Sequence, residues 1–143
     1  MSNMYTEHIM DHYKHPRNKG RMESPDINFT DNNPTCGDEI NVTFQLKDGT
    51  IAKAKQFTVG CAISQAGASM FFERIEGKTV HDVLSIPKEE ILDEFGTELS
   101  VSRVKCALLG FTVAKKALVE QQAKQGPMHN AGGETPEYND ARD

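Results

Sequence analysis

Residues 40–59, INVTFQLKDGTIAKAKQFTV, contain the pattern that decides the fold. Four apolar residues in the first half alternate with polar ones: Ile40, Val42, Phe44 and Leu46. This alternation is typical of a strand with one buried face, and Asp48-Gly49 is a strong signal for a tight turn between antiparallel strands. The second half alternates less cleanly, because Lys53 and Lys55 share a face with apolar residues; a bulge or an edge position would each explain this. The stretch predicts a β-hairpin.

Helical patterns lie on both sides of this hairpin. Upstream, residues 5–14 repeat apolar side chains at helical spacing, residues 15–20 form a stop, and residues 27–30 form a short extended segment. The helices expected downstream are residues 63–75, a short helix capped by Thr79, a short helix between Pro87 and Gly96, and a last helix from Ser100 to the stop at Gly126-Pro127. The order of helix, antiparallel strands and then helices predicts an α+β domain, in which a small antiparallel sheet of about three strands packs against several α-helices.

The length and composition are those of one domain with a tail. A chain of 143 residues, of which 37% are hydrophobic, can bury a core of its own. We expect this domain to occupy residues 1–125. Residues 126–143 are short of large apolar side chains, so we expect a disordered C-terminal tail there.

The charge and the apolar pattern exclude several kinds of partner. The net charge is −5 and no basic stripe is present, which argues against nucleic acid as the main partner. No apolar run approaches the length of a membrane span, and the first residues lack the pattern of a signal peptide. Three cysteines cannot all pair within one chain, so we expect free thiols and a cytoplasmic location.

The three cysteines lie at junctions between the predicted elements. Cys36 is in the turn-forming stretch 33–38, NPTCGD, where polar neighbours suit a reactive thiolate better than a buried structural thiol. Cys61 follows the second strand, at the start of a helix whose free amides would lower the pKa of its thiol. Cys106 lies early in the last helix. Taken one at a time, Cys61 and Cys106 are also ordinary core residues.

Other residues near the cysteines can support metal chemistry. Arg103 and Lys105 would stabilise a thiolate at Cys106 by charge attraction. Asp38 taken singly is a common turn residue, but it places a carboxylate beside Cys36. Three thiolates and one carboxylate make a complete set of protein ligands for zinc or iron.

The histidines are weaker candidates. His8 and His12 share a face of the first helix and are able to bind one metal, but that helix offers no third ligand. A solvated or partner-facing surface is the alternative for this pair.

These motifs, taken in order, resemble the IscU/SufU/NifU-N-terminal family of iron–sulfur cluster assembly scaffold proteins. The stretch 9–18, IMDHYKHPRN, is similar to the family's first helix and loop. Its three ligand motifs are matched by residues 33–38, by GCAISQA at 60–66 and by RVKC at 103–106. The resemblance covers nearly all of the chain that is expected to be structured.

The resemblance implies a function and roles for particular residues. Cys36, Asp38, Cys61 and Cys106 would bind a [2Fe-2S] cluster or iron, or Zn²⁺ in the isolated protein. Cys36 or Cys106 would accept persulfide sulfur from a cysteine desulfurase, and the finished cluster would pass to apo iron–sulfur recipient proteins. The supporting residues would be Gly37, Gly60, Arg103 and Lys105. Cluster binding would also be able to drive formation of a homodimer.

The sequence lies between two branches of this family. IscU proteins usually carry a histidine before the third cysteine, where this chain has Lys105, and a Leu-Pro-Pro-Val-Lys segment that is absent here. The Arg-x-Lys-Cys pattern resembles SufU proteins, but the extra segment that those proteins carry between the second and third cysteines is missing. Three hypotheses therefore stand: a scaffold that is not an enzyme, a zinc-dependent sulfurtransferase that activates a desulfurase, and a structural zinc-binding module.

Overall fold

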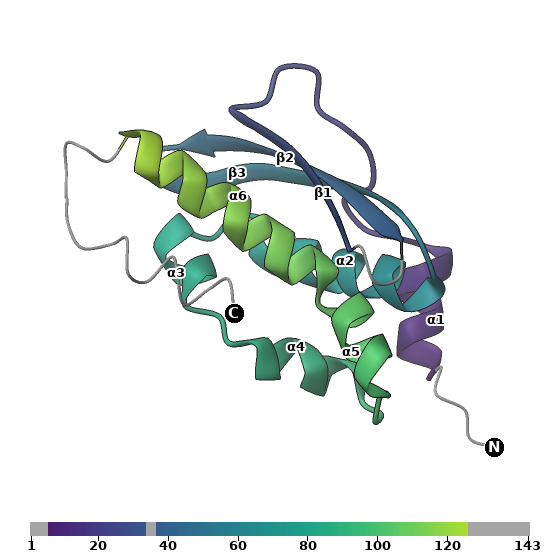
Figure 1. The fold of residues 1–143 in the computed structure, drawn as a ribbon. Coiled ribbons are helices and arrows are strands. Elements are labelled where there is room, and N and C mark those ends of the chain that lie inside the picture. The colour runs from purple at the N-terminus through teal and green to yellow at the C-terminus, as the bar shows by residue number, and fades with distance from the viewer. Residues whose placement is uncertain (1–5, 34–36, 126–143) are drawn as a thin grey trace.

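The computed structural model describes residues 6–33 and 37–125 of the chain (Figure 1). Within these residues, three strands and six helices follow one another: α1 (Glu7–Lys14), β1 (Ile27–Asn33), β2 (Asp38–Lys47), β3 (Thr50–Val59), α2 (Ala62–Ile75), α3 (Val80–Leu84), α4 (Lys88–Phe95), α5 (Val101–Ala107) and α6 (Leu109–Gln125). The predicted α+β class with a small antiparallel sheet is confirmed. The expected C-terminal tail, residues 126–143, lies outside the described residues.

The sheet has the order β1-β2-β3, and both pairs of strands are antiparallel. The hairpin turn is the predicted one, since Asp48 and Gly49 have φ angles of 52° and 79°, as a type I′ turn requires. β1 is longer than the expected segment 27–30, because its pairing with β2 continues as far as Asn33 opposite Asp38.

The irregular alternation in β3 has both of the expected causes, a bulge and an edge position. Gln45 pairs with Lys53 but Leu46 pairs with Ile51, so a bulge leaves one extra residue on β3. The bulge places Ile51 and Ala54 on the same buried face. β3 is also an edge strand, and its free edge is covered in part by the loop after α1: the amide of Gly20 donates to the carbonyl of Gln56.

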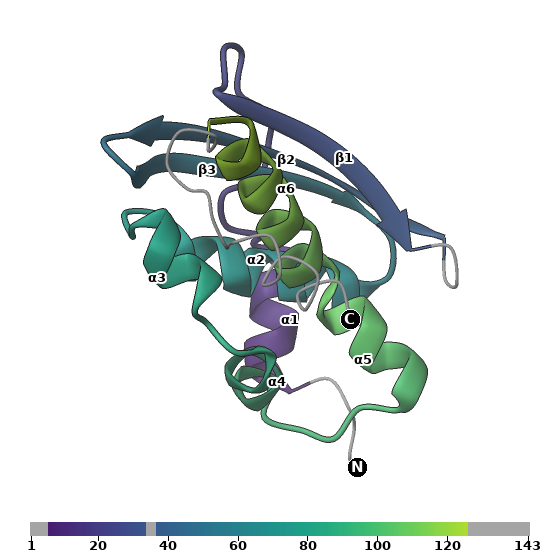
Figure 2. The same ribbon diagram turned by 60° about the vertical axis from the view of Figure 1, so that its left-hand side comes forward.

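Helices cover one face of the sheet. α6 packs against β1 and β2, α2 packs against β3, and both views show α4 on the side of these helices away from the sheet (Figures 1 and 2). The core between the layers is aromatic, with Phe44 of β2 stacked on Phe72 of α2 at 5.5 Å between ring centroids. The helix starts at Thr79 and Ser100 are confirmed, because each hydroxyl accepts a hydrogen bond from a backbone amide three residues on. Among the described residues, no helix is long and apolar enough to cross a membrane.

The prediction of one last helix from Ser100 is wrong. The chain forms two helices that are separated at Leu108, whose φ and ψ are −95° and 5°. Both helices contact α2, but α5 also contacts α4, whereas α6 also contacts α3 and the sheet. Gly110, just after the break, has no room for a side chain because a Cβ there would lie 2.8 Å from Cα of Ala68. The break at Leu108 lets residues 101–125 cover α4 with their first helix and the sheet with their second.

Candidate metal centre

Asp38 is the first residue of β2, and its side chain points into the protein. It is 4% exposed, and Ser64 of α2 donates a hydrogen bond of 2.5 Å from Oγ to its Oδ2. Gly60 lies against this carboxylate so closely that a Cβ on Gly60 would be 2.5 Å from Cγ of Asp38. The position of Asp38 therefore depends on the hydroxyl of Ser64 and on Gly60, which has no side chain to occupy the space of the carboxylate.

Cys61 is the N-cap residue of α2 and is partly exposed. Burial alone would raise the pKa of its thiol, and the nearby carboxylate of Asp38 acts in the same direction. Hydrogen bonds from the hydroxyl and amide of Ser64 and from the amide of Ile63 outweigh both effects, so the pKa lies below its usual value. This agrees with the prediction from the free amides at a helix start.

Cys106 lies in α5, is 3% exposed, and is brought to the site by the packing of α5 on α2. That packing is close at Gly67 of α2, where an added Cβ would overlap the carbonyl oxygen of Ala107. The residue next to Cys106 thus rests directly on α2. The supporting residues differ in exposure: Lys105 is exposed and Arg103 is half-buried, while the amide of Arg103 donates to the capping hydroxyl of Ser100.

The structure brings Asp38, Cys61 and Cys106 together from a strand, a helix start and a second helix. One ligand atom from each of the three residues lies within 4.8 Å of the other two. Tetrahedral zinc with Zn–S bonds of 2.3 Å needs donor atoms about 3.8 Å apart, so a small contraction is enough to bring all three onto one ion. Two thiols and a carboxylate are also the right donors for zinc or iron.

Cys36 lies outside the described residues, which break off between Asn33 and Gly37. The described chain resumes at Gly37, with φ of 78°, directly before Asp38. The role of Cys36 stays a prediction from the sequence.

Sequence reasoning missed Ser64. Its hydroxyl contacts Sγ of Cys61 at 3.3 Å as well as the carboxylate of Asp38, so it joins two of the three candidate ligands. The available signal was its place three residues after Cys61, where a side chain faces back toward the helix start.

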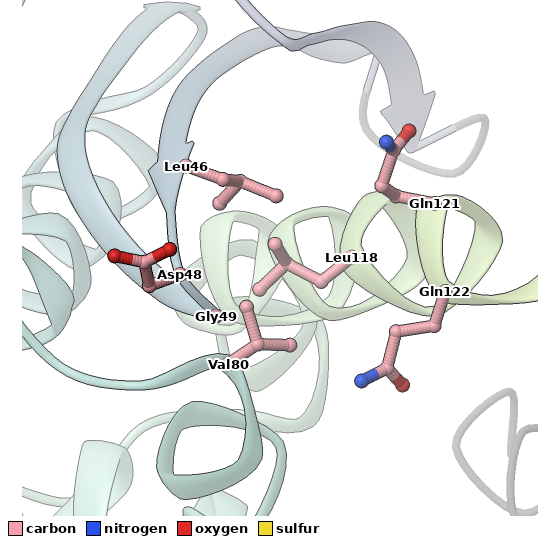
Figure 3. Close-up of a pocket in the computed structure, with 7 residues that line it drawn as sticks. All are labelled: Leu46, Asp48, Gly49, Val80, Leu118, Gln121 and Gln122. Atoms are coloured by element: carbon pink, nitrogen blue, oxygen red, sulfur yellow. The ribbon is translucent and has the colours of Figure 1, made fainter. Parts of the chain in front are cut away.

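Two other features lie apart from this centre. His8 and His12 of α1 gain a third neighbour that their own helix does not offer, since Glu94 of α4 places a carboxylate oxygen within 4.8 Å of both. A pocket lies at the opposite end of β2, beside the hairpin turn, and its lining includes Leu46, Val80, Leu118 and Gln121 (Figure 3). It contains none of the predicted site residues.

Comparison with known proteins gives consistent matches over most of the chain. The model of the NifU-like N terminal domain family matches residues 4–127. The chain is 33% identical to iron-sulfur cluster assembly scaffold protein IscU 1 of Archaeoglobus fulgidus, over 86% of this chain and 80% of that protein. It is 34% identical to the zinc-dependent sulfurtransferase SufU of Bacillus subtilis, over 85% of this chain and 94% of that protein. The crystal structure of a putative scaffold protein for the SUF system from Fervidobacterium islandicum superposes with a TM-score of 0.69 at 28% identity, covering 80% of this chain and 96% of that one.

Proposed function

Because the chain belongs to the family of the NifU-like N terminal domain, we propose that it is an iron–sulfur cluster assembly scaffold. It binds iron or a [2Fe-2S] cluster through Cys36, Cys61, Cys106 and Asp38. The observation that carries this proposal is the convergence of ligand atoms from Asp38, Cys61 and Cys106 within 4.8 Å of one another. The scaffold name of the Archaeoglobus relative supports the same function.

The chemistry of the ligands suits temporary storage. Thiolate sulfur is a soft ligand that matches iron–sulfur chemistry, whereas the carboxylate oxygen of Asp38 is a harder ligand and a poorer match. Asp38 is therefore the ligand that leaves first when the cluster passes to an apo-protein. The hydrogen bond from Ser64 to Asp38 draws electron density away from the carboxylate oxygen, which weakens the bond that this oxygen makes to iron.

Sulfur reaches the site as persulfide from a cysteine desulfurase. The thiolate of the acceptor, Cys36 or Cys106, attacks the terminal sulfur of the desulfurase persulfide; that S–S bond breaks, the desulfurase thiolate leaves, and a persulfide forms on the acceptor. An external electron donor then reduces this sulfur to sulfide as the cluster forms. Two exposed apolar residues near the site support a docking surface for the desulfurase: Val59, just before Cys61, is 59% exposed, and Val101, at the start of α5, is 81% exposed.

Anaerobic reconstitution tests the scaffold function. The full chain with ferrous iron, cysteine, a cysteine desulfurase and dithiothreitol as the electron donor is expected to develop the visible absorbance of a [2Fe-2S] cluster. Cys61→Ser and Cys106→Ser are each expected to lose this absorbance. Asp38→Ala is expected to keep the cluster and lengthen its lifetime, as followed by the decay of absorbance in the presence of an apo-protein. His81→Ala, an exposed histidine on α3, is the control. Equal cluster yields in the cysteine variants and the control would contradict the proposal.

A second candidate is a zinc-dependent sulfurtransferase, as the Bacillus relative is named. The lowered pKa of Cys61 favours this function, because it provides a thiolate for Zn²⁺ at neutral pH. Zinc would hold the thiolates until a desulfurase group displaces one of them. Strong stimulation of desulfurase turnover by the zinc-loaded chain, without cluster formation from iron and sulfide, would favour this function over the scaffold.

A further inference from the structure

A group of metal-binding side chains lies outside the cysteine centre, between α1 and α4. His8 and His12 are one turn apart on α1, with 4.7 Å between their ring centroids. Glu94 comes from the last turns of α4, and its Oε2 lies 3.0 Å from Nε2 of His8. One ligand atom from each of the three residues lies within 4.8 Å of the other two.

Neighbouring groups orient two of these side chains. His12 is 1% exposed, and its Nδ1 lies 2.7 Å from Oγ of Ser69 on α2. When Nδ1–H donates to this hydroxyl, Nε2 keeps its lone pair for a metal, which is the arrangement that metal-binding histidines usually have. Glu94 is held by Arg74, whose Nη2 is 2.7 Å from Oε1. The other oxygen of Glu94, Oε2, stays directed toward His8.

His8 supplies the open side of the group. Its side chain is 46% exposed, so water reaches the ligand atoms from this side. Metal binding requires the ring proton of His8 to move from Nε2, where it bonds to Glu94, to Nδ1. A further carboxylate is close, because Oε1 of Glu73 lies 3.7 Å from Nε2 of His12. Arg17 pairs with this carboxylate at 3.8 Å and offsets part of its charge.

We propose that His8, His12 and Glu94 form a second metal site, which binds a divalent transition metal such as Zn²⁺ with water as the fourth ligand. Two imidazoles, one carboxylate and an open position are a recognised zinc ligand set, and imidazole also suits Ni²⁺ and Cu²⁺. The site shares no residue with the cysteine centre, and its donors are nitrogen and oxygen instead of sulfur. A metal here links α1 to α4, two helices that are far apart in the sequence and that both pack on α2.

Zinc titration of the full chain tests this site. By isothermal titration calorimetry, the unchanged chain is expected to bind one more equivalent of Zn²⁺ than His8→Ala does. If His8→Ala still binds this last equivalent, its affinity for it should be lower by about 10-fold or more. His8→Ala removes a partly exposed ring, so the fold should remain, and far-UV circular dichroism checks this. Glu94→Gln, which keeps the shape and removes the charge, is the second variant and should show the same loss.

His81→Ala is the matched control, because His81 is an exposed histidine of α3 outside both groups of ligands. In ¹⁵N spectra of the histidine rings, the last equivalent of Zn²⁺ should shift the signals of His8 and His12 and leave that of His81 in place. Equal stoichiometry and affinity in the unchanged chain, His8→Ala and Glu94→Gln would overturn the proposal. Ring signals of His8 and His12 that do not respond to Zn²⁺ would also overturn it.

Discussion

At the scale of single residues, the candidate metal centre depends on Ser64 and Gly60 as much as on its ligands. Ser64 bonds to both Cys61 and Asp38, and Gly60 leaves the space that the carboxylate of Asp38 occupies. Neither residue has a thiolate or carboxylate side chain to offer as a metal ligand. Each acts by placing a ligand or by setting its charge.

Gly60→Ala is expected to displace Asp38. The new methyl group would lie 2.5 Å from Cγ of Asp38, a distance at which one of them must move. Zinc affinity, measured by competition with a chelator, should fall about 10-fold or more. Gly77→Ala is the control: its φ of 91° makes alanine strained, but nothing lies near the added methyl group, so it should cost stability of about 1 kcal/mol and leave zinc affinity unchanged. Equal zinc affinity in Gly60→Ala and the unchanged chain would contradict this placement of Asp38.

Ser64→Ala is expected to raise the pKa of Cys61, because the variant loses the hydroxyl that can turn its proton from Asp38 to the Cys61 thiolate and so stabilise it. Since only the thiolate is alkylated, the midpoint of the pH–rate profile for alkylation should move to higher pH. The measurement is made on metal-free protein, with the Cys61 peptide followed by mass spectrometry. Ser85→Ala, an exposed serine after α3, is the control. A midpoint that stays in place would show that the backbone amides alone set this pKa.

At the scale of elements, close contacts between helices decide where Cys106 lies. α5 rests on α2 at Gly67, and α6 rests on α2 at Gly110, so both halves of the last helical stretch are positioned by residues without side chains. The break at Leu108 separates the helix that carries Cys106 from the helix that covers the sheet.

Gly67→Ala tests the contact between α2 and α5. In an exposed helix interior, a change from glycine to alanine stabilises the folded protein by about 1 kcal/mol, because alanine has the higher helix propensity. Here the added methyl group overlaps the carbonyl oxygen of Ala107, so we expect destabilisation of about 1–3 kcal/mol, measured by urea unfolding. The cluster yield should fall as well, since α5 carries Cys106. A gain in stability would show that α5 does not rest on α2 at this point.

At the scale of the whole molecule, the sheet and helices bury one continuous apolar core. Among residues 6–33 and 37–125, twenty-five buried residues, Cys106 included, form one cluster that draws on α1, all three strands and each of the other helices. The candidate centre lies at one end of β2, and the pocket lies at the other end, beside the hairpin turn (Figure 3).

Metal removal is therefore expected to leave the fold intact. After treatment with a chelator, the far-UV circular dichroism spectrum should stay that of the folded chain, because the core supplies the stability. The urea midpoint should fall, since a ligand that binds only the folded state stabilises it by mass action. Complete unfolding on metal removal would instead support the structural zinc-binding module.

The sequence by itself determined the hairpin, the turn at Asp48-Gly49, most helix boundaries and the α+β class. These features follow from local patterns, such as alternation, helical spacing and capping residues, which act between neighbours along the chain. For the irregular alternation of β3, the sequence predicted a bulge or an edge position, and the structure has both.

Only the tertiary structure decided which side chains meet. The closeness of Asp38, Cys61 and Cys106 depends on how α2 packs against β3 and α5, and the arrival of Glu94 beside His8 depends on α4. The break at Leu108 likewise follows from the two surfaces that the last stretch has to cover. Contacts between distant segments are set by packing of the whole core, and local patterns along the chain do not predict them; the meeting of Asp38, Cys61 and Cys106 was expected only through the family resemblance.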